Sequence, residues 1–125
     1  MVMRCQGVRG ATTVDANSRE AILEATTELL AELMSANDLR VRDIASAFFT
    51  TTRDLNAEFP AVAANNMGFS DVAVLCGHEM DVPGSLPMCL RILLHVNTEK
   101  EPRDLVHVYL RGAKALRPDR IYEPK

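Results

Sequence analysis

The segment MCLRILLHVNT, residues 88–98, decides the fold because its side chains alternate with the two-residue period of a β-strand. Every second residue from Met88 to Val96 is apolar, and these residues share one face of the strand. Arg91 falls in the middle of the opposite face. A strand with one fully apolar face has to bury that face against another layer of the protein. The segment therefore predicts a β-strand with one side in the core and Arg91 on the other.

The layer that covers this strand is predicted to be a long helix over residues 18–34. Apolar residues such as Ile22 and Leu33 recur along one side of a helix with 3.6 residues per turn, and glutamates mark the other side. Asn17, followed three residues later by Glu20, resembles a capping box at the start of the helix. The pattern is typical of an amphipathic helix lying on a sheet.

Further segments complete the predicted sheet. They are residues 2–9, ending at Gly10; 43–51, a buried strand; 72–76, an apolar run expected to be buried on both faces; and 106–110, with 113–116 as its continuation. Short helical turns are expected over 53–67 and a turn at Pro83-Gly84. One long helix with four or five strands is an α+β architecture. Because one helix covers only part of one sheet face, we expect another copy of the chain against the other face.

Length and composition limit the classes of function. The 125 residues suit a single domain spanning 1–125, and 14 basic against 17 acidic residues give a net charge of −3, which argues against a nucleic-acid partner. No apolar run is long enough to span a membrane. The cysteines Cys5, Cys76 and Cys89 are odd in number and form no CxxC pair, which favours a reducing compartment. We therefore expect a soluble, cytoplasmic protein.

Two arginines stand out as candidates for chemistry. Arg91 lies among apolar residues in mid-strand, where an unpaired guanidinium would be costly to bury. It forms either a structural ion pair or a fixed fork aimed at an anionic oxygen. Arg9, flanked by Gly7 and Gly10, is either a surface residue or a second such cation. Composition and periodicity alone leave these alternatives open.

Other polar and aromatic residues have ordinary explanations beside functional ones. Glu79 lies in a loop after the apolar run, a position where functional residues are common. By default Cys76 is a small core residue, Tyr109 a half-buried aromatic of a strand and Phe59 a loop anchor. No second histidine follows His78 at zinc-protease spacing, and the sequence has no phosphate-binding loop and no nucleophile elbow. These patterns alone indicate a small α+β enzyme or binding module.

Several ordered segments resemble a known family. They are VRGATTV (8–14), the segment from Asp54-Leu55 to Phe59-Pro60-Ala61, CGHEMDV (76–82), Cys89-x-Arg91, HVYLRGA (107–113) and LRPD (116–119). Together, from residue 4 to residue 119, they resemble the small single-function chorismate mutases. The resemblance implies a mixed five-stranded sheet with one long helix per chain. It also implies a homotrimer in which three chains form a pseudo-α/β-barrel with active sites in clefts between subunits.

The implied activity is an isomerisation of chorismate to prephenate in aromatic amino acid biosynthesis, towards phenylalanine and tyrosine. This pericyclic rearrangement requires no cofactor, no metal and no covalent intermediate. By resemblance, Arg91 contacts the ether oxygen where negative charge builds as the C–O bond breaks. Arg9 and Tyr109 match the pair that grips the enolpyruvyl carboxylate, and Glu79 matches the acid that binds the ring hydroxyl.

The remaining matches lie at the edges of the implied site. Cys76 matches a cysteine near the ring hydroxyl, Phe59 and Leu116 match residues that wall the site, and Arg117 lies near a mobile tail over 118–125. The chain departs from the family in one stretch. Residues 62–66 contain no cation, where the family places basic residues near the ring carboxylate of the substrate. How this chain holds the ring carboxylate is therefore open, with Arg117 as a candidate.

Two other functions are compatible with the implied fold. One is a RidA-like enamine or imine deaminase, which also forms trimers with arginines between subunits. The other is a non-catalytic trimer that binds small carboxylates. The segments CGHEMDV (76–82) and HVYL (107–110) argue against the deaminase. The combination of Glu79 with Arg91 argues against a module that only binds.

Overall fold

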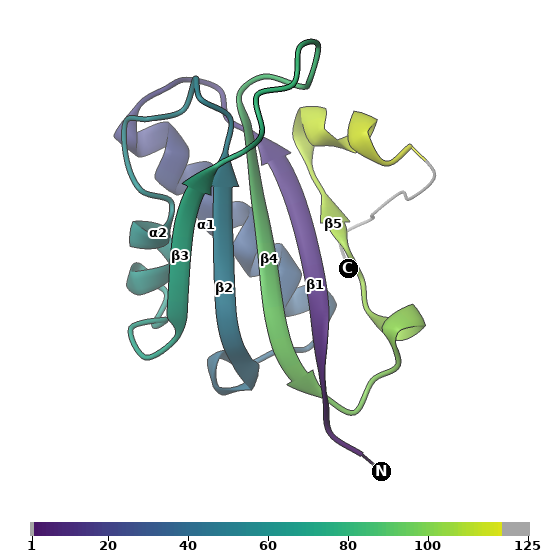
Figure 1. Ribbon diagram of the computed structural model, residues 1–125. Helices are drawn as coiled ribbons and strands as arrows, with labels where there is room; N and C mark the ends of the chain where they lie inside the picture. The colour runs from purple at the N-terminus through teal and green to yellow at the C-terminus, as the bar shows by residue number, and fades with distance from the viewer. Residues whose placement is uncertain (1, 119–125) are drawn as a thin grey trace.

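The computed structural model describes residues 2–118 as one five-stranded sheet with its α-helices on one face (Figure 1). The strands are β1 (Arg4–Thr13), β2 (Ile44–Thr51), β3 (Ala73–His78), β4 (Cys89–Thr98) and β5 (Val108–Tyr109). The helices are α1 (Arg19–Ala36), α2 (Ala61–Asn66) and the 3-10 helices η1 (Val41–Asp43), η2 (Pro102–Asp104) and η3 (Arg111–Leu116). The mixed sheet with one long helix confirms the predicted α+β fold.

The strand order is β3-β2-β4-β1-β5, which places β4 at the centre of the sheet. β4 runs antiparallel to both neighbours, whereas β3 pairs parallel to β2 and β5 parallel to β1. The predicted alternation in β4 is confirmed: Leu90, Ile92 and Leu94 are buried against the helical layer, and Arg91 points to the opposite face. That opposite face, here called the outer face, carries the functional residues described below.

The long helix begins one residue later than the predicted capping box implies. Ser18, with extended backbone angles, is the N-cap, and its Oγ accepts a hydrogen bond from the backbone N–H of Ala21 at 3.2 Å. The prediction that Asn17 caps the helix is therefore wrong. Its side-chain oxygen accepts instead from the backbone N–H groups of Asn56 and Ala57, both at 3.0 Å. These bonds tie the start of α1 to the segment after β2.

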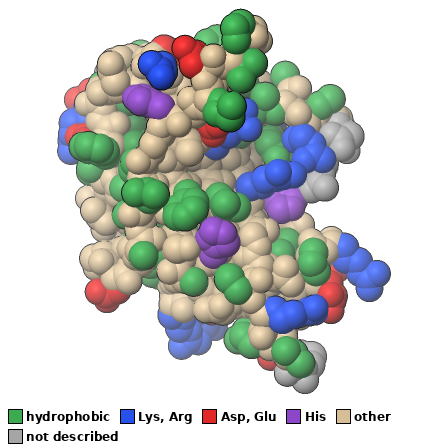
Figure 2. All heavy atoms as spheres, in the orientation of Figure 1, with side chains coloured by type: hydrophobic (Ala, Val, Ile, Leu, Met, Phe, Trp, Pro, Cys, Tyr) green, Lys and Arg blue, Asp and Glu red, His purple; other side chains and the backbone are tan. Residues whose placement is uncertain are grey.

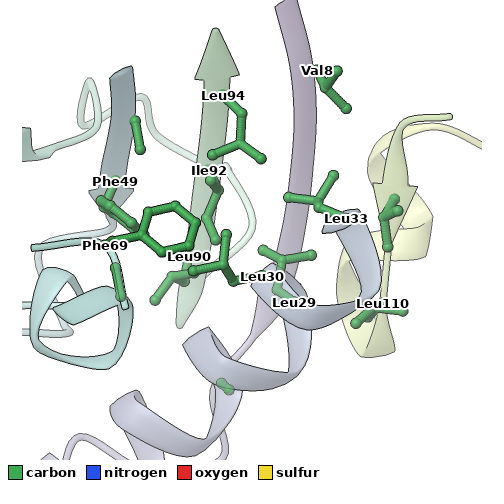
Figure 3. Packing of buried hydrophobic residues seen from close by; sticks show 14 of the residues in the cluster. Val8, Leu29, Leu30, Leu33, Phe49, Phe69, Leu90, Ile92, Leu94 and Leu110 are labelled. Carbon is green, nitrogen blue, oxygen red and sulfur yellow. The ribbon is translucent and has the colours of Figure 1, made fainter. Parts of the chain in front are cut away.

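The main core lies between α1 and the inner face of the sheet (Figure 3). Leu29, Leu30 and Leu33 of α1 are fully buried against it. Both α1 and β5 approach β1 closely because Gly10 has no side chain. A Cβ at Gly10 would lie 2.8 Å from the carbonyl oxygen of Val108 on β5 and 3.0 Å from Leu29 Cδ1 on α1. The strand predicted to end at Gly10 instead continues to Thr13. The additional residues, 11–13, pair with residues 89–91 of β4.

Two predictions about strands are wrong. β3 was expected to be buried on both faces, but it is an edge strand paired only with β2, and its Leu75 is 65% exposed. The segment 113–116 was expected to continue the strand before it, but it belongs to η3. There the backbone N–H of Ala113 donates to the carbonyl of Leu110, closing a helical turn. A run of apolar residues does not by itself distinguish these outcomes.

Within the described residues 2–118 no α-helix lies on the outer face of the sheet (Figure 1), and only η3 packs against its β1–β5 edge. Hydrophobic side chains gather across the middle of this face (Figure 2), and Phe48 is 41% exposed there. Within the same residues, no helix combines the length and the apolar character needed to cross a membrane. Of the tail predicted over 118–125, only Pro118 lies within the described residues.

Candidate active site

Strand register brings the candidate residues together in two neighbouring rows on the outer face. In the first row Thr50 lies opposite Arg91, which in turn lies opposite Ala11, and Ala11 pairs with Tyr109 across β1 and β5. In the second row Phe48 lies opposite Leu93, and Leu93 lies opposite Arg9. Residues that are adjacent across strands on one face have neighbouring side chains. Four segments far apart in the sequence thus contribute to one surface.

Arg91 and Glu79 form the charged centre of this surface. Arg91 projects from the central strand, and its Nε lies 3.7 Å from Oε2 of Glu79. Glu79 directly follows β3, where its backbone N–H donates to the carbonyl of Thr51 at 2.8 Å. The hydroxyl of Thr50 donates a hydrogen bond to Oε2 of Glu79. Both charged side chains are therefore held by regular structure and remain partly exposed.

The first and last strands supply Arg9 and Tyr109. Tyr109 is buried among Ala11, Cys89 and Ala113. It also lines a cavity, described below, that contains Arg91. The backbone N–H of Arg9 donates to Nδ1 of His107 at 3.2 Å, which fastens β1 to the segment before β5. This contact and the short β1–β5 pairing fix the spacing between Arg9 on β1 and Tyr109 on β5.

The turn of η3 carries Leu116, with Arg117 at its C-terminal cap, to the same surface. Arg111 holds the start of this turn, although its backbone takes a left-handed φ of 51° that is unfavourable for a non-glycine residue. Its guanidinium donates to the carbonyl of Thr13 and to Glu28, both at 3.2 Å. These contacts offset the backbone strain and anchor the turn to β1 and α1.

A cavity of about 430 Å³ lies over these rows. Six of the residues singled out from the sequence line it: Arg9, Glu79, Arg91, Tyr109, Leu116 and Arg117. Three guanidinium groups against one carboxylate make its lining net positive, which suits a small ligand with more than one carboxylate. Within residues 2–118 no group of three or more His, Cys, Asp or Glu side chains is placed to hold a metal ion.

Phe59 and Cys76 line a different cavity, of about 340 Å³, at the β3 edge. Phe59 is 69% exposed in the loop before α2. Cys76 pairs with Phe49 across β2 and β3, so its side chain points to the inner face. Burial raises the pKa of the Cys76 thiol, and a hydrogen bond with the backbone of Ala61 partly opposes this shift. One chain by itself therefore does not bring these two residues to Arg91.

Two further residues of the cavity, Thr50 and Phe48, were not among the sequence candidates. Thr50 holds the carboxylate of Glu79, and Phe48 packs edge-to-face on His95 with ring centroids 5.6 Å apart. The nearest signal in the sequence was the strand predicted over 43–51. Only when that strand is paired antiparallel with 88–98 does Thr50 fall on the same face as Arg91.

The stretch without a cation, Val62 to Asn66, lies within α2 (Ala61–Asn66). Neither Val62 nor Asn66 lines either cavity. The positive charge of the larger cavity comes from β1, β4 and the end of η3 instead. The departure from the family pattern therefore leaves the arginines around Arg91 in place.

Comparisons with known proteins agree with this geometry. The model of the family described as chorismate mutase type I matches residues 5–120. The chain is 47% identical over 116 residues to the chorismate mutase AroH of Thermus thermophilus, covering 91% of this chain and 94% of that protein. It is 39% identical over 118 residues to the chorismate mutase AroH of Bacillus subtilis, covering 94% of this chain and 93% of that one.

A solved structure is similar to this chain in fold as well as in sequence. A chorismate mutase from Clostridium thermocellum matches with a TM-score of 0.87 and 50% identity, covering 88% of this chain and 98% of that one. These matches span nearly the whole described chain and confirm the resemblance drawn from the ordered sequence segments. The chain therefore belongs to the chorismate mutase type I family.

Proposed function

We propose that this chain isomerises chorismate to prephenate in the cavity centred on Arg91. The observation that carries the proposal is the opposed pair Arg91 and Glu79, whose charges face one cavity with Nε and Oε2 3.7 Å apart. The rearrangement breaks a C–O bond and forms a C–C bond within one molecule, so it needs neither a nucleophile nor a proton transfer. Catalysis then depends on holding the compact conformer and on stabilising separated charge.

Arg91 and Glu79 have complementary roles in this proposal. The guanidinium of Arg91 donates to the ether oxygen, where negative charge develops as the C–O bond lengthens. Glu79 accepts a hydrogen bond from the ring hydroxyl and opposes positive charge that develops on the ring. Both groups are in place before the substrate arrives, because Arg91 projects from the central strand and Glu79 is held by Thr50. Preorganised charges of this kind do not have to reorient during the reaction.

The two carboxylates of the substrate account for the other cavity arginines. Arg9 and Tyr109 grip the carboxylate of the enolpyruvyl side chain, for which a guanidinium and a phenol supply several donors. Arg117 contacts the ring carboxylate and takes the place of the cations that 62–66 lack. The excess of three guanidinium groups over one carboxylate supports binding of a dianion.

We also propose that three copies of the chain assemble, with each site shared between two of them. Within the described residues no α-helix covers the outer sheet face, which exposes apolar side chains, Phe48 and Leu75 among them. Burial of such a face against a second copy is favourable because apolar surface leaves water. In the assembly Phe59 and Cys76 of one copy complete the cavity around Arg91 of the next. Such an assembly explains why, within one chain, Phe59 and Cys76 line a different cavity from Arg91.

The test is an assay of purified protein with chorismate, followed by ultraviolet absorbance, with prephenate identified by its acid conversion to phenylpyruvate. The proposal predicts loss of chorismate with stoichiometric formation of prephenate, and a reaction unchanged by metal chelators. Sedimentation in the same buffer gives the number of chains in the assembly. Chorismate that stays intact in the presence of folded protein would reject the activity. An enamine hydrolysis assay and a carboxylate-binding assay would then distinguish the two alternatives.

A further inference from the structure

We propose that Thr50 is a positioning residue for the reaction: its hydroxyl holds the carboxylate of Glu79 at a set distance from Arg91, so that the guanidinium stays available to the substrate. The inference rests on the proposed function of the cavity. It adds a residue that neither the sequence analysis nor the family resemblance had singled out.

The contacts of Thr50 link the two charged groups directly. Thr50 lies opposite Arg91 in the β2–β4 pairing and opposite Gly77 in the β2–β3 pairing. Its Oγ1 donates to Oε2 of Glu79, the same oxygen that lies 3.7 Å from Nε of Arg91. The backbone of Glu79 is held separately, through its N–H and the carbonyl of Thr51. The position of the Glu79 side chain is thus set by one neutral donor.

The separation of 3.7 Å is longer than a hydrogen bond between a guanidinium and a carboxylate, which spans about 2.7–2.9 Å. A carboxylate free to rotate next to a guanidinium tends to form two parallel N–H···O bonds with it. Such a pair would occupy the donors of Arg91 and neutralise its charge. The hydroxyl of Thr50 competes for the same oxygen, Oε2 of Glu79, and so keeps the pair open.

A stabilising role alone does not explain Thr50, as its neighbour Thr51 illustrates. Thr51 points to the inner face, is buried, and donates its hydroxyl to the carbonyl of Leu55 at 3.1 Å. Thr50 points to the outer face, is only partly buried and lines the cavity. The two threonines are adjacent on one strand with opposite surroundings. Because Thr51 also lines the second cavity, the control threonine is Thr26 of α1, which is fully buried and donates its hydroxyl to the carbonyl of Ile22 at 2.7 Å.

The experiment compares Thr50→Val, which removes the hydroxyl and keeps the shape, with Thr50→Ser, which keeps the hydroxyl. For Thr50→Val we expect kcat to fall by up to about 10²-fold, with a smaller change in KM, because a misplaced charge acts mainly in the transition state. Thr50→Ser should retain most of the wild-type kcat. Thr26→Val should lower the unfolding midpoint through loss of its hydrogen bond and leave kcat near the wild-type value.

Coupling to Glu79 separates positioning from a general loss of structure. If Thr50 acts through Glu79, then Thr50→Val should have little further effect on kcat in a Glu79→Ala background. Equal losses in both backgrounds would overturn the proposal. So would a Thr50→Val enzyme with wild-type kcat, or a Thr50→Ser enzyme as impaired as Thr50→Val.

A crystal structure of Thr50→Val gives a readout that does not depend on activity. The proposal predicts that the Glu79 carboxylate moves onto Arg91, at hydrogen-bonding distance from its guanidinium. A carboxylate left in its original place would overturn the proposal, whatever the kinetics. If wild-type protein fails to convert chorismate, the assigned activity fails, and this structure still decides the role of Thr50.

Discussion

Arg91 Nε on β4 and Glu79 Oε2, just after β3, lie 3.7 Å apart on the outer face, with β2 between the two strands. The two side chains are near enough to share one small substrate and are not locked into a hydrogen-bonded pair. An ion pair that served only stability would be expected to close to hydrogen-bonding distance. The open geometry favours a functional role for Arg91. The sequence alone had not distinguished this role from that of a structural ion pair.

Replacement of Arg91 by alanine should impair turnover far more than folding. Loss of one donor to developing negative charge typically lowers kcat by about 10²–10³-fold. The Arg91 side chain is 46% exposed on the outer face, and its ion-pair partner Glu79 is 32% exposed, so its removal should cost little folding stability. The measurement is steady-state kinetics beside urea unfolding of the same variant. Arg91→Lys is the matched variant, and its lone ammonium should recover only part of the activity.

The same experiment can contradict the assigned role. An Arg91→Ala enzyme that keeps wild-type kcat, or that loses activity only because it unfolds, would remove Arg91 from the reaction.

Gly10→Ala should destabilise the protein, because the new Cβ would lie 2.8 Å from the carbonyl oxygen of Val108 and 3.0 Å from Leu29 Cδ1. Overpacking of this kind typically costs about 1–3 kcal/mol in the free energy of unfolding. Gly7 lies on the same strand, and a Cβ there would meet only Leu93 Cδ1 at an ordinary 3.6 Å. Gly7→Ala is therefore the control. Equal unfolding midpoints in urea for the two variants would contradict the close approach of β5 to β1.

Asn37→Ala should also destabilise the protein, because the Asn37 side chain is fully buried and bonds to two segments. Its amide donates to the carbonyls of Leu33 and Val106 at 3.0 and 2.9 Å, and its oxygen accepts from the N–H of Val106 at 2.7 Å. A buried group left without its partner typically costs about 1–3 kcal/mol. Asn17→Ala removes comparable bonds at an exposed site and should cost less. The measurement is the free energy of unfolding of both variants in denaturant, and an equal loss in the two would contradict the prediction.

The thiol of Cys89 should make stability depend on pH in the alkaline range. Burial raises the pKa of Cys89 above its ordinary value of 9.0, and the guanidinium of Arg91 only partly opposes this shift. The folded protein then keeps the thiol proton to a higher pH than the unfolded chain does. The resulting stabilisation is complete below pH 9.0 and is lost as the pH rises through the folded pKa.

This pH dependence is measurable as a difference between wild type and Cys89→Ala. The excess unfolding free energy of the wild type should stay constant up to about pH 8 and shrink as the pH rises above 9.0. Other alkaline titrations occur in both proteins and cancel in the difference. A difference for Cys89→Ala that stays constant with pH would contradict burial of the neutral thiol.

The parts of the fold that the sequence predicted are those in which local pattern and burial agree. β4 was predictable because its alternation matches a core face and an outer face throughout, and α1 because Ile22 and Leu33 mark a continuous buried stripe. Arg91 stood out for the same reason, as a cation interrupting an apolar strand. Arg9 and Glu79 had ordinary explanations beside functional ones, and only the resemblance to a family gave them specific roles.

The parts that were missed depend on contacts distant in sequence. Whether the apolar run at β3 has neighbours on both sides depends on strand order, which periodicity does not encode. Thr50 could be recognised only after β2 was placed in register beside β4. The turn over 113–116 forms because Arg111 reaches back to Thr13 and Glu28, nearly the whole chain earlier. Sequence alone gave no indication of these three contacts.

The proposed division of the site between two copies of the chain predicts which inactive variants can rescue each other. Arg9 and Arg91 line one cavity on neighbouring strands of the same chain. Phe59 lies in the other cavity, at the β3 edge. Phe59→Asp should place an unfavourable carboxylate beside the substrate with little effect on folding, because the Phe59 side chain is largely exposed. Both Arg91→Ala and Phe59→Asp should therefore be nearly inactive as pure proteins.

Mixed assemblies of Arg91→Ala and Phe59→Asp chains should regain activity, because some of their sites combine an intact Arg91 from one copy with an intact Phe59 from another. A mixture of Arg9→Ala and Arg91→Ala should recover nothing, since every site then lacks one of the two arginines. Exchange of chains is verified by mass spectrometry of mixed assemblies before the assay. Recovery in the second mixture would mean that Arg9 and Arg91 serve different sites. Absence of recovery in the first, with exchange verified, would place Phe59 outside the site of the neighbouring copy.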